Sequence, residues 1–372
     1  MAYFEIESIE QCNSYLASGK PLNQLAFQNI DFCKVSPSIK EREITNCLFL
    51  GCKLPDGMRC KLTSSCMVFP NLKVPYNCFR STLYNAWDLY KGYNIEDDDS
   101  FERCFDTRVY QHYLRLGKRT SDIGEHLARS LHDLSITDAM YDFLEQYDEK
   151  MVVGIMGGHG LMRTEPIYRD IIEVAKDLTE RGFLLVSGGG PGAMEATHVG
   201  AWMAGRTAHE VDEAVAVLSS SPTFHDEGWL HTALQVIRDY PQKHYHSLGI
   251  PTWLYGHEPS TPFATHIAKY FTNSIREDEI LTIANGGIIY TPGSAGTMQE
   301  IFQDAVQNHY LSFGYASPMI FLGKDYWTKE MPVYNLLSYL TEKGKYKNLM
   351  LTITDDIQEV VDVLTGYPFG KR

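Results

Sequence analysis

Two stretches of this sequence each run from an apolar segment through a glycine-rich turn into a helical pattern. They are residues 183–195 (FLLVSGGGPGAME) and residues 286–300 (GGIIYTPGSAGTMQE). A tight turn between a buried strand and a helix directs backbone N–H groups and the positive end of the helix dipole toward one point, which suits a phosphate. Pro191 suits the first helical turn, where its missing N–H is not needed. Two such turns can hold one nucleotide between them.

From residue 151 to the C-terminus, short apolar runs alternate with helical patterns. We predict strands over 151–156, 183–186, 214–218, 250–255, 287–291, 318–322 and 349–353. Helices are predicted over 167–181, 193–203, 263–284, 333–341 and 357–364 and from residue 295, with an irregular stretch over 219–247. This order indicates a parallel sheet with helices on both faces, a Rossmann-like doubly wound α/β fold. Ligands of such sheets bind at the carboxyl ends of the strands, where the glycine turns lie.

The sequence before residue 150 lacks this alternation, and the chain of 372 residues is long enough for two or three domains. We predict a smaller mixed N-terminal cap domain over 1–75, a helical connector over 76–149, and the nucleotide-binding domain over 150–372. The spacing of five residues between Phe27 and Phe32 is typical of a pentapeptide-type β-coil. A small mixed domain with irregular strands is the preferred interpretation, because prolines interrupt that period.

The formal net charge of −14 argues against a nucleic-acid partner, because proteins that bind nucleic acid need a basic surface. A single nucleotide stays compatible with this charge, since backbone N–H groups and one or two arginines can hold it. The N-terminus lacks the basic and apolar segments of a signal peptide. No apolar run approaches the ~20 residues of a membrane helix. We therefore expect a cytoplasmic protein with no membrane partner.

All eight cysteines lie in the first 104 residues, which raises the question of a metal site or disulfides. There is no Cys-x-x-Cys, and the first histidine is His112, so the spacing of a zinc site is absent. Disulfides are not expected without a secretory signal. We predict no metal site, and reduced thiols that are buried as small hydrophobic groups.

The glycine turns alone leave the ligand open, because the common nucleotide and hydrolase motifs are not met. The sequence has no G-x-G-x-x-G with an acidic residue about twenty positions on, and no G-x-x-x-x-G-K-[ST]. It also lacks H-E-x-x-H and G-x-S-x-G. Classical dinucleotide binding, a P-loop, a zincin site and a serine nucleophile elbow are therefore not predicted.

Residues 187–196 (SGGGPGAMEA) and 292–300 (PGSAGTMQE) resemble the LOG ("lonely guy") family, whose hallmark is P-G-G-x-G-T-x-x-E. Gly158-His159 and the E-P-x-x-P segment from Glu258 are similar to the bacterial nucleotide 5′-monophosphate nucleosidase branch. The resemblance covers about residues 150 to 325. It implies hydrolysis of the N-glycosidic bond of a nucleoside 5′-monophosphate, with no metal or redox cofactor, in a homodimer or higher oligomer.

The resemblance also implies which residues form the site. Glu300, which closes the hallmark, and Arg276, on the helix before it, correspond to the catalytic pair. The implied phosphate-binding residues are Gly189, Gly190, Gly192, Gly293, Ser294, Ala295, Gly296 and Thr297. The residues expected to contact base or ribose are His159, Met194, Glu195 and Glu258.

The chemistry agrees with this assignment, because cleavage of an N-glycosidic bond builds positive charge on the sugar. A carboxylate beside the ribose stabilises that charge and can orient or deprotonate water. Without the resemblance, the preferred explanation of Glu300 is that it complements its helix dipole, and that of Arg276 is a surface ion pair. His225 and Trp229 either close over the base or pack in a loop.

Two departures from the family pattern leave the substrate range open, and two other functions remain. Ser294 stands at the second glycine of the hallmark, and Gln299 stands where many members have an acid. The first alternative is a non-catalytic nucleotide sensor with the same turns. The second is a lysine decarboxylase, a label sometimes given to this family, which requires pyridoxal phosphate on a lysine. Lys176, Lys243 and Lys269 lie in no such cofactor motif.

Overall fold

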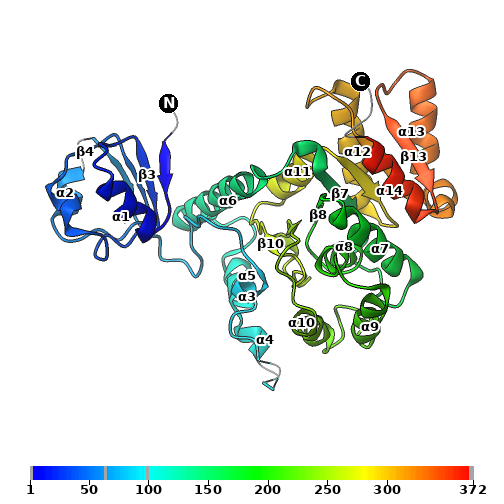
Figure 1. The fold of residues 1–372 in the computed structure, drawn as a ribbon, viewed down its shortest axis with the longest axis horizontal. Helices are drawn as coiled ribbons and strands as arrows, with labels where there is room; N and C mark the ends of the chain where they lie inside the picture. Colours follow the sequence, from blue (N-terminus) through cyan, green and yellow to red (C-terminus); the bar gives the residue numbers. More distant parts are fainter. Residues whose placement is uncertain (1–2, 63–64, 95, 98–99, 368–372) are drawn as a thin grey trace. The chain divides into compact units, whose positions relative to one another are not determined.

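The computed structural model describes residues 3–62, 65–94, 96–97 and 100–367 (Figure 1). The chain forms two compact units: residues 1–83 with 108–143, and residues 84–107 with 144–372. We call them the N-terminal and C-terminal units. Within residues 76–149, predicted as a helical connector, 76–83 and 108–143 belong to the first unit and 84–107 and 144–149 to the second.

The N-terminal unit contains a sheet of parallel strands in the order β1-β3-β5-β6 and a separate pair, β2-β4. The strands are β1 (Phe4–Ile6), β2 (Leu22–Asn23), β3 (Leu25–Gln28), β4 (Ile44–Thr45), β5 (Leu48–Leu50) and β6 (Met67–Phe69). Between them lie α1 (Ile9–Ala17), the 3₁₀ turn η1 (Pro37–Glu41) and α2 (Met58–Leu62). Every strand pair in this sheet is parallel, which is the arrangement of a β-coil rather than of irregular strands.

Aromatic rings form the centre of this β-coil. Phe27 and Phe49 lie opposite each other on β3 and β5, and their rings stack with centroids 5.0 Å apart. Phe32 meets the Phe27 ring edge-on at 5.3 Å. Gln24 and Asn46 turn the chain into β3 and β5 with φ of 58° and 50°. The stacked pair thus joins two parallel strands, whereas the pair spaced five residues apart, Phe27 and Phe32, is in edge-on contact.

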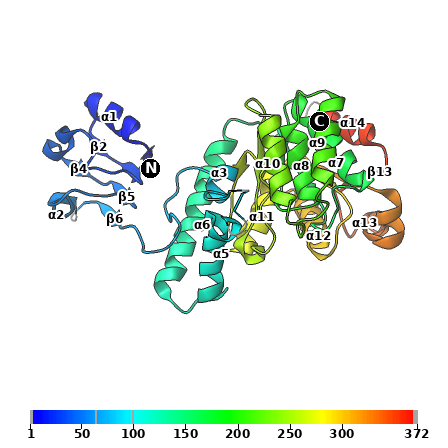
Figure 2. The same cartoon turned by 90° about the horizontal axis from the view of Figure 1, so that it is seen from below.

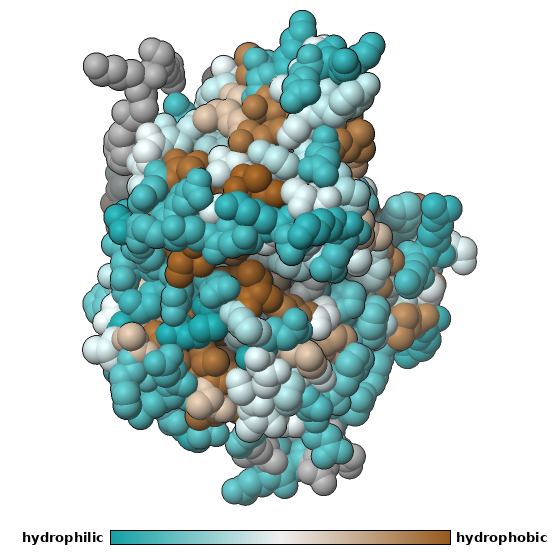
Figure 3. Space-filling view, turned by 90° about the vertical axis from the view of Figure 1, so that its right-hand side faces the viewer, coloured by the Kyte–Doolittle hydropathy of each residue, from teal (hydrophilic) through white to brown (hydrophobic). Residues whose placement is uncertain are grey.

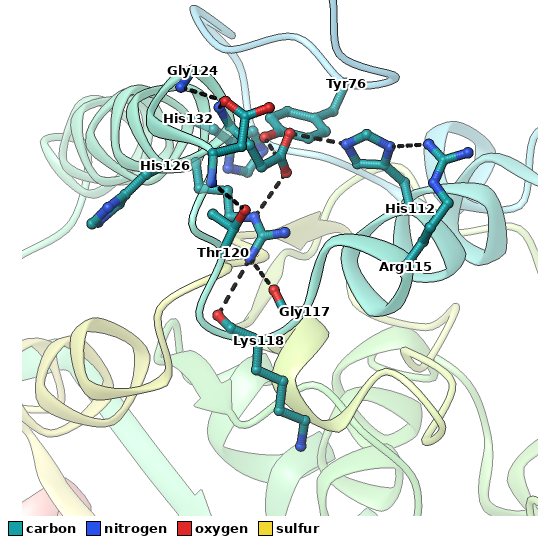
Figure 4. Close-up of polar contacts among 12 residues, drawn as sticks. Tyr76, His112, Arg115, Gly117, Lys118, Thr120, Gly124, His126 and His132 are labelled. Carbon is teal, nitrogen blue, oxygen red and sulfur yellow. Dashed lines mark hydrogen bonds and ion pairs between the residues drawn. The ribbon is translucent and has the colours of Figure 1, made fainter.

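Two helices, α5 (Phe105–Leu116) and α6 (Ile123–Leu144), form a hairpin that is fastened by a buried carboxylate. The Glu125 carboxylate accepts hydrogen bonds from Tyr76 Oη at 3.1 Å and Arg129 Nε at 2.8 Å, and it lies 2.9 Å from His112 Nε2 (Figure 4). Arg129 also donates to the carbonyl of Gly117 in the loop between the helices. These bonds compensate for the burial of the charges, so the cluster is explained as structural.

The C-terminal unit is built on a parallel seven-stranded sheet in the order β10-β9-β8-β7-β11-β12-β13. The strands are β7 (Val152–Met156), β8 (Leu184–Ser187), β9 (Ser247–Gly249), β10 (His266–Ile267), β11 (Gly287–Tyr290), β12 (Pro318–Leu322) and β13 (Met350–Thr354). Residues of β7, β8, β11 and β12 are almost completely buried, as expected for strands covered on both faces.

Helices cover both faces of this sheet (Figure 2). The helices α7 (Pro166–Glu180), α8 (Ala193–Trp202) and α14 (Ile357–Gly366) pack together on one face, and α11 (Asn273–Ile283) packs with α12 (Ala295–Tyr310) on the other. The remaining helical segments are α3 (Ala86–Leu89), α4 (Ser100–Arg103), η2 (Glu149–Met151), α9 (Ala208–Ser219), α10 (Trp229–Asp239), η3 (Trp253–Tyr255), the π-helical turn η4 (Tyr326–Glu330) and α13 (Val333–Glu342). The Rossmann-like α/β fold predicted from the sequence is thus the observed one.

Four of the predicted segments differ from the structure in type or extent. The predicted strand over 214–218 lies within helix α9, because its buried residues Val211, Ala214 and Leu218 follow helical spacing. The predicted strand over 250–255 is replaced by β9, which ends at Gly249, and by the 3₁₀ turn η3. The predicted helix over 263–284 begins only at Asn273, because the residues before it form β10 and an extended buried segment. The stretch predicted as irregular contains α10.

Residues 84–107 are anchored to the C-terminal unit by a buried ion pair. Lys269, which is 1 % exposed, lies 2.7 Å from Asp106, and it also donates to Ser260 Oγ. The indole N–H of Trp253 donates to the same Asp106 carboxylate at 2.8 Å. The lysine is thus engaged in structural contacts, which gives no support to a cofactor-bearing role for it.

The predicted burial of the cysteines was partly wrong. Cys12, Cys47, Cys78 and Cys104 are buried free thiols, as predicted, and Cys52 and Cys66 are partly exposed. Cys33 is exposed. The side chain of Cys60 lies outside the described part of the structure.

Exposed apolar side chains include Leu336 and Tyr339 on α13 and Met350 on β13. The face of the molecule seen in Figure 3 is mainly hydrophilic, with apolar patches scattered between the polar side chains. Within the described ranges, no helix combines the length and the apolar composition that crossing a bilayer requires.

Candidate functional site

The strand order reverses at β7, which places the glycine turns together. The chain proceeds from β7 through β8 and β9 to β10 in one direction, then returns to β11 on the other side of β7. At such a switch point the loops leave neighbouring strands toward opposite faces and open a crevice at the carboxyl ends. The turns at 157–160, 188–192 and 292–296 follow the three central strands β7, β8 and β11.

Gly158 joins the other two turns through its own backbone. Its N–H donates to the carbonyl of Pro292 at 3.0 Å, and its carbonyl accepts from the N–H of Ala193 at 3.1 Å. A Cβ at Gly192 would overlap the Gly158 carbonyl, and one at Gly293 would lie 3.0 Å from the Gly158 nitrogen. Glycine is therefore required where the three turns touch, because no side chain fits between their backbones.

The 292–296 turn, called the second turn below, leads into the N-terminus of a long helix. Helix α12 begins at Ala295, and the first four N–H groups of a helix have no partner within it. The residues predicted to bind phosphate here, Gly293, Ser294, Ala295, Gly296 and Thr297, lie together at this helix end. Thr297 is buried with its hydroxyl packed against Gly293. The arrangement can bind an anion through N–H groups and the helix dipole.

The 188–192 turn, called the first turn below, is held by a buried serine–histidine pair that was not predicted from the sequence. The N–H of Gly189 donates to Ser187 Oγ at 3.2 Å, so this predicted phosphate donor is used inside the turn. Ser187 Oγ lies 2.8 Å from His198 Nε2, and His198 Nδ1 lies 2.9 Å from Ser247 Oγ. Burial lowers the pKa of His198 to about 3, so its imidazole is neutral. Of the predicted donors in this turn, Gly190 and Gly192 remain for a ligand.

Glu300 and Arg276 lie side by side at the glycine turns. Arg276 Nη1 on α11 is 3.9 Å from Glu300 Oε1 on α12, and the two side chains are 13 % and 12 % exposed. Arg276 Nε donates to the carbonyl of Ile250 at 2.9 Å. A Cβ at Gly188 would overlap the Arg276 guanidinium, which therefore packs on the first turn. The pair thus connects the first turn with the helix that follows the second.

The protonation of Glu300 is set by its surroundings. Burial raises the pKa of its carboxyl to about 7, the Arg276 guanidinium opposes this rise, and the Glu277 carboxylate adds to it. Glu277 is held in place by the side-chain amides of Asn273, at 2.5 Å, and Gln299, at 2.9 Å. A carboxyl that titrates near neutral pH suits general acid–base catalysis.

Three of the four residues predicted to contact base or ribose line the first turn. His159 Nδ1 is 3.6 Å from Glu258 Oε1, and the other Glu258 oxygen lies 3.8 Å from a Cβ position at Gly190. The Met194 sulfur is 2.6 Å from a Cβ position at Gly188. These side chains therefore surround the turn from which a ligand would extend.

Glu195, the fourth, is directed into the protein interior. It is completely buried, and its two oxygens accept hydrogen bonds from Arg163 at 2.5 and 2.8 Å. Tyr168 Oη donates to the same carboxylate at 3.0 Å. Arg163 also donates to the carbonyls of Ser221 and Trp229. The ion pair therefore fixes the loop 221–229, and both oxygens of Glu195 are already bonded to protein groups.

A cavity of about 120 Å³ lies beside these turns. Its walls are His159 to Leu161, Pro191, Gly192, Glu195 and residues 222–225 with Trp229. The Phe224 ring meets the His159 ring edge-on at 6.2 Å, and the His225 ring is tilted against it with centroids 4.0 Å apart. Trp229 is buried with Arg163 over its ring, which favours packing in the loop.

Several solved structures have a distant likeness to this chain. No protein-family model matches the sequence, and no curated protein matches it. The molybdenum cofactor binding protein of Rippkaea orientalis has a TM-score of 0.37 and 14% identity, over 58% of this chain and 95% of its own. The Moco carrier protein of Chlamydomonas reinhardtii has a TM-score of 0.33 and 14% identity, over 57% and 94%. The protein TM1055 has a TM-score of 0.36 and 18% identity, over 57% and 98%. Likenesses this low carry no argument about function.

Proposed function

We propose that this protein hydrolyses the N-glycosidic bond of a nucleoside 5′-monophosphate to free base and ribose 5-phosphate. The observation that carries the proposal is the Arg276–Glu300 pair, 3.9 Å apart between a glycine turn and a helix N-terminus. An anion bound at that helix end would hold one end of the substrate within reach of the largely buried Glu300 carboxyl. The resemblance of the two glycine motifs to the LOG family supports the same reaction.

The 5′-phosphate is proposed to bind at the N-terminus of α12. The N–H groups of Ser294 to Thr297 and the dipole of a helix of 16 residues favour negative charge there. Backbone donors of this kind need no metal ion and no cluster of lysines. The overall negative charge of the chain is therefore compatible with a phosphate ligand.

Glu300 is proposed to act on both the sugar and the water. As the C1′–N bond breaks, its electron pair leaves with the base, and positive charge develops on the ribose beside the carboxylate. A water oxygen then bonds to C1′ and gives one proton to Glu300, the departing base nitrogen takes up a proton from solvent, and Glu300 afterwards releases its proton to solvent, so that one water is consumed. Arg276 favours the ionised carboxylate and fixes its position, because the guanidinium is itself bonded to Ile250.

The test is to incubate the purified protein with AMP, GMP, CMP and UMP and to measure free base by chromatography. We expect release from at least one nucleotide and its loss in Glu300→Gln. Asp304→Asn is the matched control, because Asp304 is a buried carboxyl one turn further along the same helix. Retained turnover in Glu300→Gln would refute the mechanism, and no release from any nucleotide by the unmodified protein would refute the function.

A non-catalytic nucleotide sensor is the second candidate. It is favoured by the presence of a second compact unit, the N-terminal one, in addition to the unit that carries the glycine turns. Calorimetry that shows tight binding of a nucleoside monophosphate, together with no base release, would support the sensor over the hydrolase.

A further inference from the structure

A tyrosine distant in sequence is bonded to the turn at the start of α12. Tyr326 begins the π-helical turn η4, which follows β12, the neighbour of β11 in the sheet. Its hydroxyl donates to the carbonyl of Gly293 at 2.6 Å. Gly293 lies at the contact of the glycine turns, and Ser294 is the residue that precedes the first turn of α12.

The platform that carries this hydroxyl is rigid. Trp327, the next residue, is completely buried, and its indole N–H donates to the carbonyls of Tyr290 and Leu322 at 3.2 and 3.0 Å. These carbonyls belong to the last residues of β11 and β12. The rings of Tyr326 and Trp327 meet edge-on with centroids 4.9 Å apart. Tyr326 is therefore held, through Trp327, at the end of β11, the strand from which the 292–296 turn departs.

Because the peptide bond is planar, the hydrogen bond to the Gly293 carbonyl also sets the direction of the Ser294 N–H. In a planar trans peptide the C=O and the following N–H point in opposite directions. Binding the Gly293 carbonyl to Tyr326 therefore directs the Ser294 N–H away from the tyrosine. Glycine at position 293 offers little resistance to rotation of this peptide. The hydroxyl supplies the restraint that the glycine lacks.

The preceding peptide is restrained in the same way. The carbonyl of Pro292 accepts from the N–H of Gly158, which fixes the direction of the Gly293 N–H. Two successive peptides of the turn thus have their carbonyls bonded to partners outside it. Both N–H groups are set before a ligand arrives, which is the preorganisation that anion binding requires.

We propose that Tyr326 is a positioning residue for the substrate phosphate: its hydroxyl holds the Gly293–Ser294 peptide so that the Ser294 N–H faces the anion. This inference rests on the proposed function, because it takes the α12 N-terminus as the phosphate site. The ligand class is a phosphate monoester, and inorganic phosphate and ribose 5-phosphate serve as its probes. Tyr326 touches the turn and not the reacting atoms.

The test is Tyr326→Phe, which removes the hydroxyl and keeps the ring. Losing one aligned donor to a charged group weakens binding about tenfold. We therefore expect the Kd for ribose 5-phosphate, measured by calorimetry, and the KM for the nucleotide to rise about tenfold, with kcat nearly unchanged. Hydrogen–deuterium exchange in the peptide over 292–298 is expected to accelerate. A general structural defect would instead lower the thermal stability and kcat together.

Tyr334→Phe is the matched control, because Tyr334 packs its ring on Phe321 at 5.4 Å and lies in the next helix, α13. Unchanged Kd, KM and exchange in Tyr326→Phe would overturn the inference while leaving the proposed function standing. A failure of the unmodified protein to bind inorganic phosphate or ribose 5-phosphate would overturn both.

Discussion

Arg276 lies directly over Gly188, so that a Cβ at residue 188 would occupy the space of the guanidinium. The same guanidinium is 3.9 Å from the Glu300 carboxylate. The glycine of one turn thus determines where the partner of the proposed catalytic acid can lie. This relationship links backbone sterics to catalysis and can be tested by adding a single methyl group.

Gly188→Ala is expected to reduce base release about 100-fold, because a displacement of about 1 Å at a catalytic group costs that much. Gly160→Ala is the matched control, since Gly160 also lies in a glycine turn and a Cβ there meets no atom within 4 Å. Steady-state rates and thermal melting of both variants provide the measurement. Equal activity in the two variants would contradict the placement of Arg276.

The activity is expected to depend on pH through Glu300. Because burial raises the pKa of this carboxyl to about 7, against the opposing effect of Arg276, kcat/KM should fall about tenfold per pH unit below that value. Arg276→Gln removes the nearby positive charge and should move the inflection to higher pH. A profile that is flat between pH 5 and 8 would show that Glu300 is not the titrating base.

Glu300 is also expected to destabilise the fold at high pH. Its folded pKa of about 7 lies above the ordinary value of 4.5, so the folded state retains a proton that the unfolded state has lost between these values. Stability from this group is therefore present below pH 4.5 and is lost as pH rises through 7, by on the order of 3 kcal/mol. Glu300→Gln should accordingly be more stable than the unmodified protein at pH 8. Urea unfolding at pH 5 and pH 8 measures this, and a less stable variant at pH 8 would be the contrary result.

Breaking the internal Arg163–Glu195 pair is expected to destabilise the C-terminal unit by about 3–5 kcal/mol, because one charge would remain buried without its partner. Arg163→Ala and Glu195→Gln both test this by denaturant unfolding. Arg169→Ala is the control, since Arg169 pairs with Asp212 at the surface and such pairs contribute about 0–1 kcal/mol. A similar loss in all three variants would contradict the structural role of the buried pair.

The main architecture of the C-terminal unit could be predicted from sequence because its central strands are short, apolar and separated by helices. The failures have particular causes. The run around Ala214 is apolar on consecutive positions and reads as a strand, yet its burial follows a helix. Strand β10 has only two residues, His266 and Ile267, and is too short to give a pattern. Its buried neighbours Tyr270 and Phe271 then imitate one face of a helix.

Candidate site residues could be named from the sequence only where they follow one another in the chain. The glycine turns and Glu300 form continuous motifs, and Arg276 could be assigned from the resemblance. Ser187 at the end of β8 meets His198 on the following helix α8, and their partner Ser247 lies on another strand, β9. Tyr326 reaches Gly293 from 33 positions away. Such contacts depend on the three-dimensional path of the chain and leave no local pattern.

The backbone of Gly158 makes the three turns interdependent. Its N–H is bonded to the turn at 292–296 and its carbonyl to the turn at 188–192. A shift of any one turn must therefore be accommodated by the other two. We therefore expect that changes which accommodate ligands of other sizes occur in the loop at 221–229 and in the side chains around Glu258. Residues 157–158 are expected to tolerate no change in length or composition. Enlarging the anion site by inserting a residue there would disconnect all three turns at once.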